Sequence, residues 1–142
     1  MQEVGRAMEA IDDFLRGLRA KLYDRRHGHF IAYIDSQRCY IIYTATTLRN
    51  PKALFSKDFG EMLGVRSSIL TQDFDYIVWV VERNNCISVY MERSYRVNSF
   101  CLENKTVYRN KQTGEYICNY PLNRTRKVYE KCITKTLMDY RK

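Results

Sequence analysis

Three carboxylates flank an apolar stretch of the sequence and are the side chains best suited to catalysis. Asp73 and Asp75 stand immediately before the apolar run 76–81, and Glu92 lies within the next β-rich run, 87–97. Two carboxylates brought together can hold a divalent cation such as Mg²⁺, which activates a water molecule against a phosphodiester. The spacing therefore indicates a metal site, or else a polar turn before a strand and one carboxylate on its solvated face.

This arrangement resembles the core of the PD-(D/E)XK nucleases, which hold a divalent ion between an aspartate on one strand and a carboxylate on the next. The resemblance implies a Mg²⁺-dependent nuclease acting on DNA, with Asp73 or Asp75 and Glu92 as catalytic residues and Asp75 and Glu92 as metal ligands. The family's lysine has no counterpart here, because Ser94 stands at its position. We therefore take this nuclease as the alternative function, and outside it we expect no cofactor.

The segment 56–72 carries a second pattern with functional meaning. Gly60 would stand in the middle of a first helix, and Gly64 would supply the left-handed residue of a sharp turn. Apolar residues at 59, 63, 65, 69 and 70 would form the buried faces of two helices. The polar residues between them are of types that contact bases or phosphates in a major groove: Arg66, Ser67, Ser68, Thr71 and Gln72.

In these residues the segment resembles the helix-turn-helix DNA-binding family, and the hairpin 76–93 after it would then be a wing. The resemblance implies that the five polar residues bind double-stranded DNA, and that the protein works as a dimer on paired half-sites. The alternative is a short amphipathic helix pair packed on a sheet. A third class of function, a protein-binding module with no nucleic-acid role, also remains open.

Positive charge is concentrated at the C-terminal end of the chain. The 142 residues carry a net charge of +8, and residues 101–142 carry 10 basic and 4 acidic side chains. Apolar groups recur with helical spacing over 124–140, which predicts a basic C-terminal helix. A concentrated positive surface attracts phosphate without reading sequence. The side chains predicted to contact phosphate are Arg124, Arg126, Lys127, Lys131 and Lys135.

The remaining patterns predict an α+β fold in a single domain over 1–142. Apolar residues at spacings of three and four over 4–22 predict an amphipathic N-terminal helix, which is also suited to a homodimer seam. Alternating β-branched and aromatic residues predict three antiparallel hairpins, over 30–44, 76–97 and 106–120. With the helix-turn-helix pair and the basic C-terminal helix, these elements make up the expected architecture.

Composition excludes several classes of protein. The charged fraction of 28% and the low glycine and proline content argue against disorder, and no apolar run is long enough to cross a bilayer. The five cysteines show no CxxC pair, so we expect mostly buried free thiols, although one or two disulfides are compatible with the sequence. We expect an intracellular protein, cytoplasmic or in a host cytoplasm, with no membrane partner, because no signal-peptide core is present.

Overall fold

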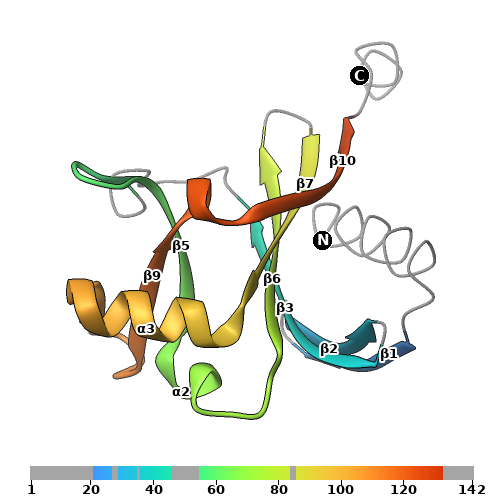
Figure 1. The fold of residues 1–142 in the computed structure, drawn as a ribbon, viewed down its shortest axis with the longest axis horizontal. Helices are drawn as coiled ribbons and strands as arrows, with labels where there is room; N and C mark the ends of the chain where they lie inside the picture. The colour runs from blue at the N-terminus through green and yellow to red at the C-terminus, as the bar shows by residue number, and fades with distance from the viewer. Residues whose placement is uncertain (1–20, 27–28, 35, 46–54, 84–85, 133–142) are drawn as a thin grey trace.

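Two β-sheets and two short helices build the part of the chain that the structure describes (Figure 1). This computed structural model describes residues 21–26, 29–34, 36–45, 55–83 and 86–132. Most of the predicted N-terminal helix and its dimer seam, and the end of the chain including Lys135, lie outside the described residues.

The larger sheet has six strands in the order β1-β2-β3-β6-β7-β10. Every neighbouring pair is antiparallel except β3 with β6, which run parallel. The run Ile77–Val81 of β6 is buried throughout, because both faces of this central strand are covered. The strands are β1 (Lys21–Arg26), β2 (His29–Ile34), β3 (Gln37–Ala45), β6 (Tyr76–Arg83), β7 (Cys86–Arg93) and β10 (Arg126–Cys132).

The smaller sheet is antiparallel and has the order β4-β5-β9-β8. Gly114 lies in the turn between the strands Val107–Arg109 and Tyr116–Pro121 of this sheet. Its φ of +75° is a conformation that favours glycine. The strands of this sheet are β4 (Phe55–Ser56), β5 (Gly60–Arg66), β8 (Val107–Arg109) and β9 (Tyr116–Pro121).

Three helical segments connect and cover the sheets: α2 (Ser67–Leu70), α3 (Ser94–Asn104) and the 3₁₀ turn η2 (Leu122–Arg124). In α3 the buried residues Val97, Phe100 and Cys101 recur at helical spacing, and Lys105 ends the helix with a left-handed φ of +53°. Within the described residues, no helix has the length and apolar character needed to span a bilayer.

The core lies between the two sheets and under α3. Trp79 of β6 is fully buried, and its indole Nε1–H donates to the carbonyl of Gly64 in β5 at 3.0 Å. Its ring stacks on Tyr120 of β9, with 6.3 Å between the centroids and 2° between the planes. Phe100 of α3 meets the same tyrosine edge to face at 5.4 Å. Tyr120 of β9 therefore contacts both the larger sheet, through Trp79, and α3, through Phe100.

The predicted fold class is wrong, because the described residues are mostly strand and contain no helix-turn-helix pair. The segment 56–72 forms β4, β5 and the single turn α2. Gly60 has a φ of +76°, which a helix interior does not allow, and Gly64 lies inside a strand. A Cβ on Gly64 would lie 3.3 Å from Ile117 Cγ2, so this glycine permits a close approach between strands rather than a turn.

The predicted basic C-terminal helix is also wrong as far as Cys132, because residues 126–132 form the edge strand β10. The pairing of β10 with β7 shifts register between Lys127 and Tyr129, which is a β-bulge. A bulge interrupts the two-residue alternation of a strand, and the sequence therefore has a spacing that resembles a helix.

The three predicted hairpins are present as β2–β3, β6–β7 and β8–β9. Two boundaries differ from the prediction. Lys21–Arg26 pairs with β2 as a strand instead of continuing a helix, and the strand after Cys86 ends at Arg93 rather than continuing to residue 97. The four residues from Ser94 onwards begin α3, where Val97 is buried.

Candidate nucleic-acid interface

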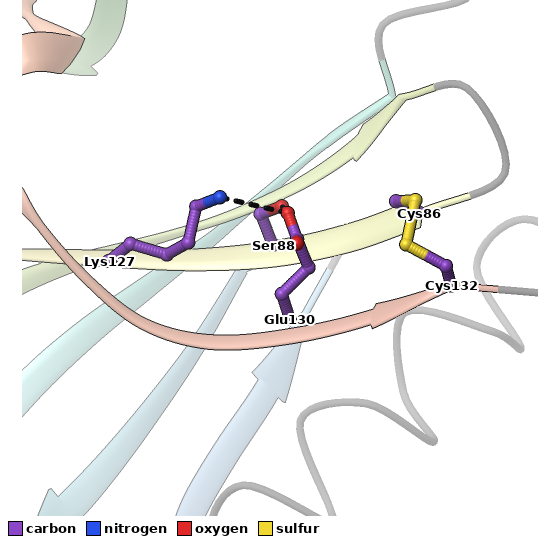
Figure 2. Close-up of a disulfide and its surroundings, with 5 residues drawn as sticks. All are labelled: Cys86, Ser88, Lys127, Glu130 and Cys132. Atoms are coloured by element: carbon purple, nitrogen blue, oxygen red, sulfur yellow. Dashed lines mark hydrogen bonds and ion pairs between the residues drawn. A yellow bond between two sulfur atoms is a disulfide. The ribbon is translucent and has the colours of Figure 1, made fainter.

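Strand β10 is fixed to the edge of the larger sheet by a covalent bond and by polar contacts (Figure 2). A disulfide joins Cys86 of β7 to Cys132 of β10, which are directly paired residues of the two strands. Ser88 Oγ donates to Glu130 Oε2 at 2.8 Å, and the same oxygen accepts from Lys127 Nζ at 2.9 Å. This hydrogen bond raises the pKa of Lys127 and lowers the pKa of Glu130. The cations of β10 are therefore carried by an anchored strand.

Two of the cations predicted to contact phosphate, Arg124 in η2 and Lys127 in β10, lie over aromatic rings. The guanidinium of Arg124, in η2, lies 4.7 Å from the ring centroid of Phe100 in α3. The ammonium of Lys127 lies 6.0 Å from the ring centroid of Tyr90 in β7. Cation–π contacts restrict these long side chains while leaving their heads at the surface. Two further cations of β10, Arg126 and Lys131, are exposed.

One face of β7 connects these cations with a pocket. Alternate residues of a strand share a face, so Ser88, Tyr90 and Glu92 point to the same side of the sheet. Lys127 of β10 lies over Tyr90 on this face, and Glu92 further along the same face lines the pocket.

The pocket has a volume of about 450 Å³ and lies where α3, the end of β7, β9 and η2 meet. Arg96 Nε donates to the hydroxyl oxygen of Tyr95 at 3.4 Å, and this hydrogen bond raises the pKa of the arginine. The fold thus brings Arg96 and Arg124, from distant parts of the chain, to one opening. The lining residues are Glu92, Tyr95, Arg96, Ser99, Phe100, Glu103, Tyr120 and Arg124.

Glu92 is a buried carboxylate that accepts two hydrogen bonds. The Tyr120 hydroxyl donates to Glu92 Oε2 at 2.7 Å, and the backbone N–H of Arg93 donates to Oε1 at 2.8 Å. Burial, followed by the hydrogen bond to Glu92, raises the pKa of Tyr120 well above its ordinary value. The tyrosine therefore stays protonated at neutral pH and remains a donor to the carboxylate.

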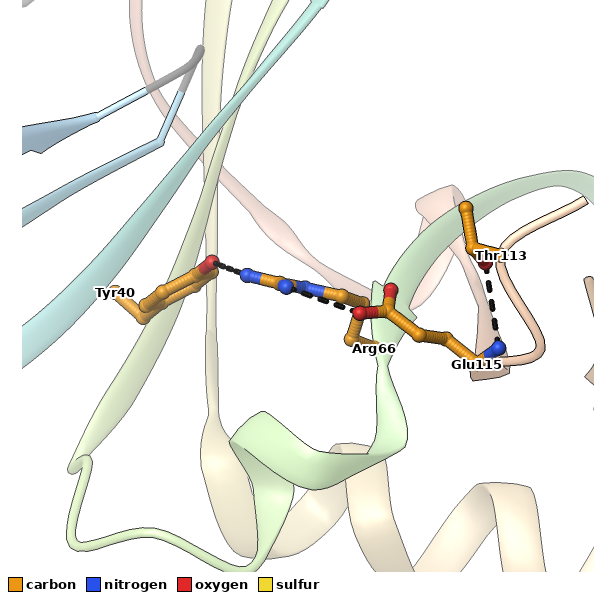
Figure 3. A network of polar contacts seen from close by, with 4 residues as sticks. All are labelled: Tyr40, Arg66, Thr113 and Glu115. Carbon is orange, nitrogen blue, oxygen red and sulfur yellow. Dashed lines mark hydrogen bonds and ion pairs between the residues drawn. The ribbon is translucent and has the colours of Figure 1, made fainter.

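Arg66, one of the predicted groove-reading residues, is used inside the structure (Figure 3). Its Nη2 donates to the Tyr40 hydroxyl at 2.8 Å, and its Nη1 lies 3.4 Å from Glu115 Oε1. Thr113 Oγ1 in turn accepts from the backbone N–H of Glu115 at 3.2 Å. The side chain connects β5 to β3 and to the start of β9, and this position gives it a structural role.

The other predicted groove-reading residues do not lie on a recognition helix. Ser67 and Ser68 belong to the single turn α2, and Thr71 and Gln72 follow it. The Thr71 hydroxyl donates to the carbonyl of Ser68 at 2.9 Å, a local bond that closes the turn. The helix-turn-helix interpretation therefore loses its geometric basis, since α2 is too short to enter a groove.

Two carboxylates of the alternative nuclease site, Asp75 and Glu92, accept hydrogen bonds within the fold, whereas Asp73 is contacted through its backbone carbonyl. Asp75 Oδ2 accepts from the backbone N–H of Arg38 at 2.8 Å, where β3 runs beside β6. The carbonyl of Asp73 accepts from the Arg38 guanidinium at 3.4 Å, and Glu92 is bound as described above. In the described part of the chain, no group of three or more His, Cys, Asp or Glu side chains could hold a metal ion.

The sequence interpretation missed Tyr95, Arg96 and Tyr120 as site residues. The sequence predicts a strand over 87–97, and in a strand Tyr95 and Arg96 would point to opposite faces. In α3 both side chains line one opening. The spacing of Val97, Phe100 and the following cysteine was the available signal for a helix, because apolar residues three and four apart share a helix face.

Comparisons of this chain with protein families, with curated proteins and with solved structures found no match. The pocket and the cations beside it combine a buried carboxylate, Glu92, with aromatic rings and the exposed guanidinium groups of Arg96 and Arg124.

Proposed function

We propose that the protein binds nucleic acid at the surface formed by η2, β10 and the first turn of α3. The observation that carries the proposal is the convergence of Arg96 and Arg124 on one pocket, with Lys127 over Tyr90 on the face of β7 that leads to this pocket. Phosphate groups spaced along a backbone are the ligand that such a row of fixed cations fits. We refer to Arg96, Arg124 and Lys127 as the cationic row; Arg126, which precedes Lys127 in β10, points to the opposite face of the strand.

The charge distribution supports this location. The C-terminal third of the chain, which contains η2 and β10, carries most of the positive excess, with 10 basic and 4 acidic side chains over 101–142. Because β10 is an edge strand, its outer side has no neighbouring strand within the described sheet. An extended anionic partner could follow this edge without displacing any described element.

Positioning of the cations supports it further. Arg124 lies over Phe100 and Lys127 lies over Tyr90, so each side chain is restrained while its charged head stays at the surface. Cations restrained in this way lose less side-chain entropy when a phosphate binds. The ring of Tyr95, which is 62% exposed at the same surface, offers a face on which a base can stack.

Fluorescence anisotropy with labelled oligonucleotides tests the proposal. Double-stranded DNA, single-stranded DNA and single-stranded RNA of equal length are titrated with the full chain over a range of salt concentrations. We expect binding whose logarithmic dissociation constant rises linearly with the logarithm of salt, because phosphate contacts release counterions. Replacing Arg96, Arg124 and Lys127 together by Gln should weaken binding at least tenfold and reduce the salt slope by about 0.7 to 0.9 per lost contact.

A matched variant controls for net charge. Lys57, Arg109 and Lys111 are exposed and lie outside the proposed surface, and replacing all three by Gln removes the same charge. This control should keep most of the affinity. Equal losses in the two triple variants, or no binding to any of the three nucleic acids, would overturn the proposal.

A further inference from the structure

The pocket beside the cationic row contains an acceptor that phosphate cannot use. Two carboxylates line the pocket, the buried Glu92 and the exposed Glu103, and a carboxylate repels an anion placed against it. Arg96 and Arg124 line the same pocket and attract an anion. A ligand that satisfies both features has hydrogen-bond donors at one end and a negative charge at the other. A nucleotide has this polarity.

The hydrogen bonds of Glu92 define which donors the pocket can accept. A carboxylate has about four lone-pair sites, two on each oxygen. Tyr120 occupies one site on Oε2, and the backbone N–H of Arg93 occupies one on Oε1. One acceptor site on each oxygen therefore remains for a ligand. Two adjacent N–H groups on one edge of a base match such a pair, and among the common bases guanine alone presents them, as N1–H and the exocyclic N2 amine.

The remaining lining suits a flat aromatic ligand. Tyr95 stands at the opening with its ring 62% exposed, whereas Phe100 and Tyr120 belong to the wall and are almost fully buried, with Arg124 over one ring and Trp79 stacked on the other. Bases bound outside a duplex stack on tyrosine or phenylalanine rings or on arginine guanidinium planes. The volume of about 450 Å³ lies within the range of roughly 300–1,000 Å³ typical of small-molecule sites.

We propose that this pocket binds an unpaired guanine base of a nucleic acid, with Glu92 accepting the N1–H and N2 amine and with Arg96 and Arg124 contacting the flanking phosphates. This inference rests on the proposed function and adds to it a preferred base. It makes Glu92 a residue that selects the base, and the cationic row the residues that bind the backbone.

The test uses two single-stranded oligonucleotides, a thymidine 12-mer and the same 12-mer with one central deoxyguanosine. Thymine presents a single imide N–H between two carbonyl oxygens, which a carboxylate disfavours. We expect the guanine to tighten binding on the order of tenfold, the discrimination typical of a good bidentate contact. Deoxyinosine, which keeps N1–H and lacks the N2 amine, should give an intermediate affinity, and N1-methyl-deoxyguanosine should behave as thymidine.

The Glu92→Gln variant supplies the matching change in the protein. Glutamine can still accept from Tyr120, but it replaces one acceptor oxygen by a donor nitrogen, so the ratio of the affinities for the guanine-containing and all-thymidine 12-mers should fall to about one. This ratio is the quantity compared, because loss of the Glu92 charge strengthens binding of any anionic strand. The modified bases carry the same test without any variant, should Glu92→Gln fail to fold. Equal affinity for the guanine-containing and all-thymidine 12-mers overturns the inference and leaves the proposed function standing. Absence of binding to every oligonucleotide overturns both.

Discussion

Tyr120 donates its hydroxyl to the carboxylate of Glu92 at 2.7 Å, and this single bond joins the end of β9 to the end of β7 at the wall of the pocket. The two residues are 28 positions apart in the chain and lie in different sheets. The tyrosine ring also stacks on Trp79, so the orientation of the carboxylate depends on the packing of the core.

Replacing Tyr120 by Phe should therefore destabilise the protein without removing any ring contact. A hydrogen bond to a charged group contributes about 1.5–3 kcal/mol, and we expect the free energy of unfolding in urea to fall by about that amount. Tyr116→Phe is the matched control, because Tyr116 is 56% exposed, and it should change stability by less than about 0.5 kcal/mol. Equal stability of Tyr120→Phe and the native protein would contradict the role given to this bond.

The disulfide should account for a substantial part of stability, since it closes a loop of 46 residues between β7 and β10. Loop-closure entropy predicts a contribution of about 4 kcal/mol for a loop of that length. We expect reduction by dithiothreitol to lower the urea midpoint of the native chain. A Cys86→Ser, Cys132→Ser double variant should already have the lower midpoint and should not respond to the reductant. A native chain whose midpoint is unaffected by complete reduction would contradict this prediction.

Arg66 should affect stability and leave nucleic-acid binding unchanged. Loss of its hydrogen bond to Tyr40 in Arg66→Ala should cost about 1–2 kcal/mol of unfolding free energy. The contact with Glu115 adds little, since both side chains are more than a third exposed. Gln72→Ala, at an exposed position after α2, should change neither stability nor affinity. A large loss of affinity in either variant would place the interface at β5 and α2 instead.

Stability should fall with alkaline pH through Cys39. Burial, followed by the charge of Asp75, raises the pKa of this thiol from 9.0 to about 12. Because the folded pKa lies above the unfolded one, the stabilisation is fully present below about pH 9 and is lost progressively as the pH rises towards 12. Urea unfolding between pH 8 and 10.5 should show this decline, and Cys39→Ala should have a shallower slope. Identical slopes for the two proteins would assign the pH dependence to other groups.

The sequence predicted the hairpins well because their residues alternate between β-branched or aromatic and polar types. It failed where a strand is covered on both faces. In β5, Met62, Leu63 and Val65 are all buried, so the apolar positions do not alternate, and their spacing resembles that of a helix. In β10 the bulge after Lys127 has the same effect.

The candidate site was predictable only in part, for a related reason. The concentration of cations from Arg124 onwards is visible in the sequence, and Glu92 is visible there as a candidate site residue. The pocket is not visible in the sequence. It depends on α3, whose first turn the sequence predicts as part of the preceding strand, and on the hydrogen bond from Tyr120 to Glu92 of β7. Contacts of this kind join residues far apart in the chain and leave no local spacing pattern.

Photo-crosslinking tests the central claim, that nucleic acid binds along η2, β10 and α3, most directly. A single-stranded oligonucleotide carrying 4-thiothymidine is irradiated with the full chain, and the crosslinked residues are identified by mass spectrometry. We predict crosslinks within 93–103 and 122–131, including Tyr95 at the pocket opening, and their loss at high salt. Crosslinks concentrated within 66–72, or confined to the β8–β9 hairpin, would contradict the proposed interface.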